Sequence, residues 1–448
     1  MRLTVTQVSD LLSGKQVGDL PSGDVTVTGY SVDTRTLQPG DLFFALRGPN
    51  HDGNAYLEQA LGLGACAVVT ERPAEGPVIV VPDALLALQQ LARWARSRWG
   101  GEVIGVTGSA GKTSTKDAIA ALLSTAMSVG KTAGNFNNQV GLPLSILKLP
   151  DSARVAVLEL GMNHPGEIRD LAQIAQPRIA VVTNVGYAHI EGFESIDGIA
   201  AAKRELVEAL PSDGVAILNA DDARVLRFRA AHRGRTITYG LSEAAELRAT
   251  AVEHLSDGAR FRIGATLFET ELTGRHGILN ILAAIAVAGV YGIPLERLQE
   301  AVRDLKPGKM RGVRMRRNGM TILDDSYNSN PDAARAMLDV LRDTPANRHI
   351  AVLGEMLELG GWSESLHRSV GHYATESGIS VLVGIRGAAR KMVDAAIEAG
   401  LQSSAAFFFE DPAPAGEQLR SIAREGDAIL FKGSRGTRVE LALERFLS

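Results

Sequence analysis

Residues 103–113 read VIGVTGSAGKT. The mostly apolar residues 103–106 predict a buried strand, and the pattern that begins at Lys112 predicts a helix. Between the two, Gly108 and Gly111 allow the backbone to curl so that successive N–H groups and the helix N-terminus face an anion. Because strand, glycine-rich turn and helix follow in this order, the sequence predicts a phosphate-binding loop. Its residues are Thr107, Gly108, Ser109, Ala110, Gly111, Lys112 and Thr113.

Two side chains of the loop suit a nucleoside triphosphate. Lys112 places a positive charge at the β- and γ-phosphates, and the hydroxyl of Thr113 can hold Mg²⁺. The first position of the G-x-x-x-x-G-K-[ST] pattern falls on Val106, so the loop is a T-G-x-x-G-K-[ST] variant. This form of the loop motif predicts ATP binding. It leaves open whether the γ-phosphate drives a motor, operates a switch or activates a substrate.

Two further apolar strands end in residues that can serve this chemistry. The predicted strand 155–158 runs into Glu159, and the strand 179–182 is followed by His189. Because the carboxyl ends of parallel strands open onto one crevice, Glu159 is predicted to hold Mg²⁺ and His189 to face the same site. Lys203 lies in the next helical segment, and its pattern alone is typical of a solvated lysine.

The alternation of strands and helices predicts an α/β protein of three domains. Residues 1–99 predict a small α/β N-terminal domain, which closes with a helix at 84–99. Residues 100–308 predict a central doubly wound domain with a parallel sheet around the phosphate loop. Residues 309–448 repeat the strand-helix alternation and predict a Rossmann-like C-terminal domain. A basic stretch at 303–317 lies at the second junction.

Composition limits the partners and the location. The 448 residues carry 47 basic and 51 acidic side chains, a formal charge of −4, so no global positive field attracts nucleic acid or anionic lipid. The longest apolar run, 281–293, is too short to span a bilayer. The N-terminus lacks the apolar segment of a secretory signal, and the single Cys66 cannot form an internal disulfide. The sequence predicts a cytoplasmic monomer without nucleic-acid partners or membrane insertion.

Four more motifs follow in order, and with the loop they resemble the Mur ligase family of ATP-dependent amide-bond synthetases. The resemblance covers nearly the whole chain and includes the order of the three domains. The motifs are GNFNN at 134–138, DDSYNSNP at 324–331, LGEMLELG at 353–360 and KGSR at 432–435.

The resemblance implies a catalytic set of Lys112, His189, Lys203 and Arg311. Glu159, His189 and Thr113 are implied as ligands of two Mg²⁺ ions. Lys203 is implied to be N-carbamylated, because a carbamate is an anionic metal ligand whereas an ammonium beside two cations is repelled.

The resemblance also implies which residues bind the nucleotide and where a hinge between domains lies. Asn280 is implied near the adenine, Asp325 on the ribose, and Arg311 at the γ-phosphate. Closure of the third domain over the substrates is expected, with a hinge near 305–312, because an acyl phosphate in an open cleft would hydrolyse.

The substrates are implied in the same way. Ser31, Asp33 and Arg35 resemble the family's uridine-nucleotide-binding segment, and further substrate-binding residues are implied at Asn137, Asn138, Tyr327, Asn328 and Asn330. The segment 328–331 reads NSNP and lacks the Asp-Asn-Pro-Arg of the diaminopimelate-adding branch. This favours the branch that adds D-alanyl-D-alanine to UDP-N-acetylmuramoyl-tripeptide (UDP-MurNAc-tripeptide) in peptidoglycan synthesis. A folylpolyglutamate-type ligase and a non-ligase phosphate-loop ATPase or switch remain as alternatives.

Overall fold

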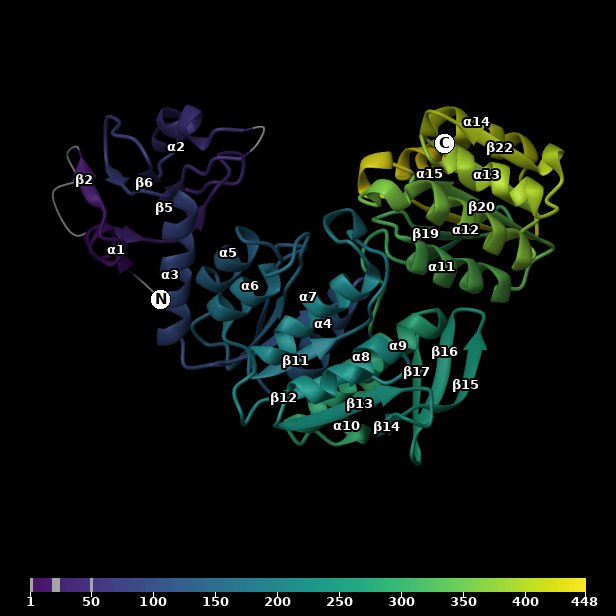
Figure 1. The fold of residues 1–448 in the computed structure, drawn as a ribbon, viewed down its shortest axis with the longest axis horizontal. Helices are drawn as coiled ribbons and strands as arrows, with labels where there is room; N and C mark the ends of the chain where they lie inside the picture. Colours follow the sequence, from purple (N-terminus) through teal and green to yellow (C-terminus); the bar gives the residue numbers. More distant parts are fainter. Residues whose placement is uncertain (1–2, 18–24, 49–50) are drawn as a thin grey trace.

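The structure, a computed structural model, describes residues 3–17, 25–48 and 51–448. Figure 1 shows three α/β domains, with the second lying between the first and the third. Helix α3 (Ala84–Arg98) leads from the first domain into the second, as the sequence predicts. The predicted fold class is confirmed: each domain is built on its own mainly parallel or all-parallel sheet.

The first domain has a five-stranded sheet in the order β2-β7-β6-β5-β4. Neighbours from β4 to β7 pair in parallel, and β2 pairs with β7 antiparallel. All residues of β5 and β6 are buried, as continuous apolar runs in parallel strands require. The other elements are a two-stranded antiparallel pair, β1-β3, and the helices α1 and α2. The bounds are β1 (Leu3–Thr4), α1 (Val5–Leu11), β2 (Lys15–Val17), β3 (Thr26–Val27), β4 (Gly29–Ser31), β5 (Asp41–Phe44), α2 (Leu57–Gly62), β6 (Ala67–Thr70) and β7 (Val78–Val80).

The second domain has a seven-stranded, all-parallel sheet with both faces covered by helices. Side chains alternate along β8, so that Ile104 and Val106 pack with α4 and α9 while Val103 packs on the side of α6 and α7. Strand β8, which leads into the phosphate loop, lies between β10 and β11. In sheet order the strands are β14 (Leu247–Arg248), β13 (Arg235–Gly240), β12 (Val215–Asn219), β11 (Ile179–Val182), β8 (Glu102–Thr107), β10 (Val155–Glu159) and β9 (Val129–Lys131). The helices are α4 (Lys112–Ser124), α5 (Gly141–Leu147), α6 (Glu167–Ala175), α7 (Ile196–Glu208), α8 (Ala223–Leu226), α9 (Gly274–Val290) and α10 (Leu295–Arg303).

The apolar run at 281–293 falls mostly within α9. Its residues from Ile281 to Ala288 are buried against the sheet and α4, which explains their apolar character without a bilayer. None of the helices in the described ranges combines the length and the apolar character that a bilayer span requires.

Two antiparallel additions are not expected from the sequence. A three-stranded sheet extends the second domain, with β15 (Thr250–Leu255), β16 (Gly258–Ile263) and β17 (Thr266–Thr270). Its apolar face is narrow, because Phe261 stacks on Phe268 while β15 is almost wholly exposed. The other addition is β18 (Val313–Arg317), which forms from the basic stretch and pairs antiparallel with the first strand of the third domain. Both lack the long apolar runs that indicate buried strands.

The third domain has a six-stranded sheet in the order β18-β19-β23-β20-β21-β22. Except for β18, its strands are parallel, as the sequence predicts. The bounds are β19 (Met320–Asp325), α11 (Pro331–Asp343), β20 (Arg348–Gly354), α12 (Ser363–Glu376), β21 (Val381–Ile385), α13 (Ala389–Glu398), β22 (Ala406–Phe409), α14 (Pro412–Ile422), β23 (Asp427–Lys432) and α15 (Glu440–Leu447).

Arg96, near the end of α3, joins the linker helix to the second domain. Its Nε donates to the carbonyl oxygen of Ala175 at 2.7 Å and its Nη2 to that of Gln176 at 3.2 Å. Both acceptors lie at the C-terminus of α6, where a cation is favourable. We expect Arg96→Ala to lower the free energy of unfolding by about 1–2 kcal/mol, measured from the urea midpoint. Arg93→Ala, an exposed arginine of the same helix, serves as the control, and equal midpoints for both variants would contradict the assignment.

Candidate active site

The phosphate loop links the end of β8 to the start of α4. Gly108 has φ +153° and Gly111 has φ +79°, conformations that side chains disfavour. A Cβ on Gly108 would lie 1.8 Å from Oγ1 of Thr183, and one on Gly111 would lie 2.6 Å from Oδ1 of Asn280. The N-cap of α4 is Gly111, which has no side chain to accept a hydrogen bond from the first N–H groups of the helix. The N-terminal N–H groups of α4 are therefore available to an anion.

Three residues of the loop hold its shape. The hydroxyl of Thr107 donates to the carbonyl oxygen of Leu160 at 2.8 Å. The hydroxyl of Ser109 donates to the carbonyl oxygen of Gly186 at 2.9 Å, and the backbone N–H of Ala110 donates to Oδ1 of Asn184 at 2.8 Å. Thr107 and Ser109 are buried. Their side chains thus fix the loop against the strand ends.

Lys112, Thr113 and Glu159 come together at the first turn of α4. Lys112 Nζ donates to the carbonyl oxygen of Gly108 at 2.8 Å, and burial lowers the pKa of Lys112 while the Glu159 carboxylate opposes that shift. The hydroxyl of Thr113 donates to Oε2 of Glu159 at 2.8 Å, and Nδ2 of Asn137 donates to Oε1 at 2.7 Å. Glu159 itself is 1% exposed and is the last residue of β10.

Lys203 projects from α7 toward this cluster. It is 2% exposed, and burial sets its pKa well below the ordinary lysine value, with a further lowering by the charge of Lys112. Among the residues that the structure describes, none accepts a hydrogen bond from its amine. The expectation of a solvated helical lysine, which the pattern alone favoured, is therefore wrong. Burial without an acceptor disfavours the charged ammonium of Lys203 relative to the neutral, nucleophilic amine.

His189 pairs with Glu358, a residue of the LGEMLELG motif to which the sequence analysis gives no partner in the second domain. Both His189, at φ +61°, and Glu358, at φ +62°, occupy left-handed backbone positions in loops. Nδ1 of His189 lies 2.6 Å from Oε2 of Glu358, and this contact lowers the pKa of Glu358. Glu358 belongs to the LGEMLELG motif of the third domain, so the pair bridges two domains beside the phosphate loop.

The third domain also brings Arg311 to the site. The Arg311 guanidinium lies 3.8 Å from the ring centroid of Tyr327, a cation–π contact. Burial is the main cause that lowers the pKa of Lys112, and the positive charge of Arg311 adds to this lowering. Asn330, the N-cap of α11, has its Nδ2 3.5 Å from the carbonyl oxygen of Ser109.

Asn280 of α9 lies directly behind the loop, and Asp325 is the last residue of β19 in the third domain. Oδ2 of Asp325 accepts from Nζ of Lys432 at 2.5 Å, and Lys432 also donates to the carbonyl oxygen of Asn328 at 2.9 Å. Burial lowers the pKa of His276 at the start of α9, and the charge of Asp325 opposes that shift. Asn280 is buried behind the loop, where its Oδ1 accepts from the hydroxyl of Thr115 at 3.1 Å.

Four of the predicted substrate-binding residues form hydrogen bonds or ion pairs within the chain, away from the phosphate loop. Arg35 and Asp33 pair at 2.6 Å in the first domain, and the hydroxyl of Ser31 donates to the carbonyl oxygen of Asp33 at 3.0 Å. In the described part of the chain, none of these three has a hydrogen bond to the phosphate loop. Oδ1 of Asn138 accepts from the backbone N–H of Gly141 at 2.8 Å, so this side chain holds the turn that leads into α5.

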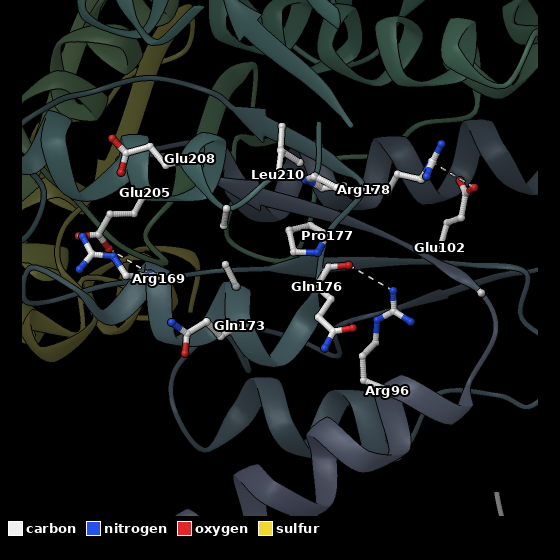
Figure 2. Close-up of a pocket in the computed structure, with 14 residues that line it drawn as sticks. Arg96, Glu102, Arg169, Gln173, Gln176, Pro177, Arg178, Glu205, Glu208 and Leu210 are labelled. Carbon is white, nitrogen blue, oxygen red and sulfur yellow. Dashed lines mark hydrogen bonds and ion pairs between the residues drawn. The ribbon is translucent and has the colours of Figure 1, made fainter. Parts of the chain in front are cut away.

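A cavity of about 620 Å³ lies at the amino ends of strands β8 and β11 of the central sheet, opposite to the carboxyl ends where the phosphate loop lies. Figure 2 shows its lining, with Glu102 at the start of β8 and Arg178 just before β11. The charges of the lining are largely paired, since Arg169 lies 3.4 Å from Glu205 and Arg178 lies 3.6 Å from Glu102. The phosphate loop follows the carboxyl end of β8, so this cavity is separate from it.

Three sequence models match the chain in domain order. They are described as the Mur ligase family catalytic domain, at residues 26–96, the Mur ligase middle domain, at 106–288, and the Mur ligase glutamate ligase domain, at 310–435. The chain belongs to the Mur ligase family, which confirms the resemblance.

Within the family, the similarity is to UDP-N-acetylmuramoyl-tripeptide–D-alanyl-D-alanine ligases. That of Bacillus subtilis (strain 168) is 34% identical, over 98% of this chain and 97% of the relative. That of Escherichia coli (strain K12) is 35% identical over the same shares of both chains. A crystal structure of MurF from Acinetobacter baumannii matches with a TM-score of 0.91 and 30% identity, over 100% of this chain and 99% of that one. MurF from Thermotoga maritima in complex with ADP matches with a TM-score of 0.83 and 30% identity, over 94% and 97%.

Proposed function

We propose that this chain is the ATP-dependent ligase that joins UDP-MurNAc-tripeptide to D-alanyl-D-alanine, giving the UDP-MurNAc-pentapeptide of peptidoglycan synthesis. The observation that carries the proposal is the phosphate loop with its uncapped helix N-terminus, met from the third domain by Asn330 at the carbonyl oxygen of Ser109 and by Glu358 at His189. Relatives with this named activity align over nearly the whole chain. The reaction belongs in the cytoplasm, where ATP is available, and we propose a monomer.

The chemistry follows from the poor reactivity of a carboxylate. Its charge is spread over both oxygens, so an amide forms only after one oxygen becomes a good leaving group. The tripeptide carboxylate attacks the γ-phosphorus of ATP, the bond to ADP breaks, and an acyl phosphate forms. The amine of D-alanyl-D-alanine then attacks the acyl carbon, loses a proton and displaces phosphate. Lys112 and Arg311 stabilise the negative charge that develops on the transferring phosphoryl group.

The residues around Glu159 fit Mg²⁺. Within the described ranges no three histidine, cysteine or carboxylate side chains form a cluster of metal ligands. The hydroxyl of Thr113 and the carboxylate of Glu159, 2.8 Å apart, are nevertheless oxygen donors of the kind Mg²⁺ prefers beside ATP phosphates. Thr113, Glu159, His189 and a modified Lys203 would hold two such ions, which would neutralise phosphate charge when bound.

Lys203 fits the carbamate that the family resemblance implies. A neutral, buried amine can attack CO₂, forming an N–C bond and releasing one proton, whereas an ammonium cannot. The product would place an anionic group beside Lys112, where the unmodified amine has no acceptor.

The substrates are assigned to domains. We place the uridine nucleotide on Ser31, Asp33 and Arg35 of the first domain, and ATP on the second with Asn280 and Asp325 at its nucleoside end. Other substrate contacts are proposed for Asn137, Asn138, Tyr327, Asn328 and Asn330. The domain bounds are proposed at 1–99, 100–308 and 309–448, with the hinge in the loop between α10 and β18.

Phosphate release measured while each substrate is omitted in turn tests the function. We expect turnover only when ATP, UDP-MurNAc-tripeptide and D-alanyl-D-alanine are all present, together with mass-spectrometric detection of the pentapeptide. Comparable phosphate release without an amine acceptor would indicate an ATPase instead. Turnover supported by folate in place of the uridine nucleotide would indicate a folylpolyglutamate-type ligase.

A further inference from the structure

The segment 183–187, which follows β11, holds the phosphate loop. The hydroxyl of Thr183 donates to the carbonyl oxygen of Ala110 at 2.6 Å, and Nδ2 of Asn184 donates to the same oxygen at 3.1 Å. The backbone N–H of Gly186 donates to the Ser109 hydroxyl oxygen at 2.8 Å. Any group that fixes this segment therefore also acts on the shape of the loop.

The third domain reaches this segment through the first turn of α11. Oδ2 of Asp332 accepts a hydrogen bond from the backbone N–H of Tyr187 at 2.8 Å. The approach is close, because a Cβ on Gly186 would lie 2.2 Å from that oxygen and 2.8 Å from the Asp332 Cγ. Gly186 has no positive φ, so its lack of a side chain serves this contact and not a backbone conformation.

We propose that Asp332 is a positioning residue that docks the third domain on segment 183–187 and so sets Arg311 and the phosphate loop in register. The proposal rests on the proposed function for its kinetic test. A charged hydrogen bond to a backbone N–H is stronger than a neutral one, whereas the neighbouring Asn330 contact, at 3.5 Å, is at the limit of hydrogen-bond length. One carboxylate and one glycine thus carry the contact with segment 183–187, whereas the His189–Glu358 pair joins the two domains at a separate point.

The competing explanation is that Asp332 only stabilises α11, because an acidic residue in the first turn favours a helix. The two explanations differ at Gly186. Gly186→Ala leaves Asp332 and α11 unchanged but fills the space that the docked carboxylate occupies. If docking matters, Gly186→Ala and Asp332→Ala impair the same step.

Steady-state kinetics on the full chain separate the explanations. We expect kcat to fall about tenfold or more in Asp332→Ala and in Gly186→Ala, with the KM for UDP-MurNAc-tripeptide unchanged. Asp332→Asn retains an oxygen that can accept from Tyr187 and keeps most of the activity. The double variant Gly186→Ala/Asp332→Ala should lose no more kcat than the less active single variant. Both substitutions disrupt the same contact, so their effects do not add. Gly289→Ala, where an added Cβ meets nothing within 4 Å, is the control.

Small-angle scattering with ADP and UDP-MurNAc-tripeptide tests docking without turnover. The wild type should be more compact than Asp332→Ala and Gly186→Ala, with Asp332→Asn close to wild type. Independent, additive losses in the double variant, or scattering profiles equal to wild type, would overturn the positioning role. A wild type that adopts the compact form but does not turn over would refute the proposed function and not the docking contact.

Discussion

Replacing Lys112 with alanine should lower the rate of ligation about 10²- to 10³-fold and leave the fold intact. Lys112 Nζ is held at the loop by the carbonyl oxygen of Gly108, where on the proposed function it would meet the phosphates of ATP. Its charge is needed most while negative charge grows on the transferring phosphoryl group. Loss of one such preorganised group costs about 10²- to 10³-fold in kcat. Phosphate release with all three substrates present measures the effect.

A control variant separates this loss from unfolding. Lys148→Ala removes an exposed lysine at the end of α5 and should retain wild-type turnover. Lys112→Ala should keep the thermal transition of the wild type, because the side chain makes one internal hydrogen bond in the described structure. Near-wild-type turnover of Lys112→Ala would refute the assignment of the phosphate site.

The phosphate loop could be predicted because its geometry is local. Gly108 and Gly111 stand between a strand and a helix that are adjacent in the sequence, and both adopt positive φ values. The parallel sheets could be predicted for a similar reason, since buried strands such as β8 and β10 appear as unbroken apolar runs. Local patterns thus determined the fold class and the position of the loop.

Contacts between domains could not be predicted in the same way. Glu358 and Asp332 reach the second domain from the third, and their roles depend on how two separately folded domains meet. In the sequence, Asp332 is an ordinary acidic residue in the first turn of a helix. Asn138 shows another such dependence, because the sequence does not reveal that the amide oxygen of this motif residue accepts from the backbone N–H of Gly141. The strands β15 to β17 were missed because their burial comes from partners such as Phe261 and Phe268, not from a continuous apolar run.

We expect a second large loss of activity when Lys203 is replaced. Lys203→Ala should lower kcat about 10²- to 10³-fold, because it removes the group that would become an anionic ligand beside Lys112. Dialysis of the wild type against CO₂-free buffer should reduce activity, and added bicarbonate should restore it. A wild type whose activity does not respond to bicarbonate would count against the modification.

A spectroscopic measurement identifies the modification without turnover. Incubation of the wild type with ¹³C-bicarbonate should give a carbamate resonance in the ¹³C spectrum that Lys203→Ala lacks. The burial of Lys203 makes this assignment specific: a solvated lysine is protonated at neutral pH, whereas the pKa of Lys203 is held low by the apolar surroundings and by Lys112. Small carboxylates such as formate can enter the space left in Lys203→Ala and should restore part of its activity. They should not rescue Lys112→Ala, because an anion cannot replace the positive charge at the phosphates.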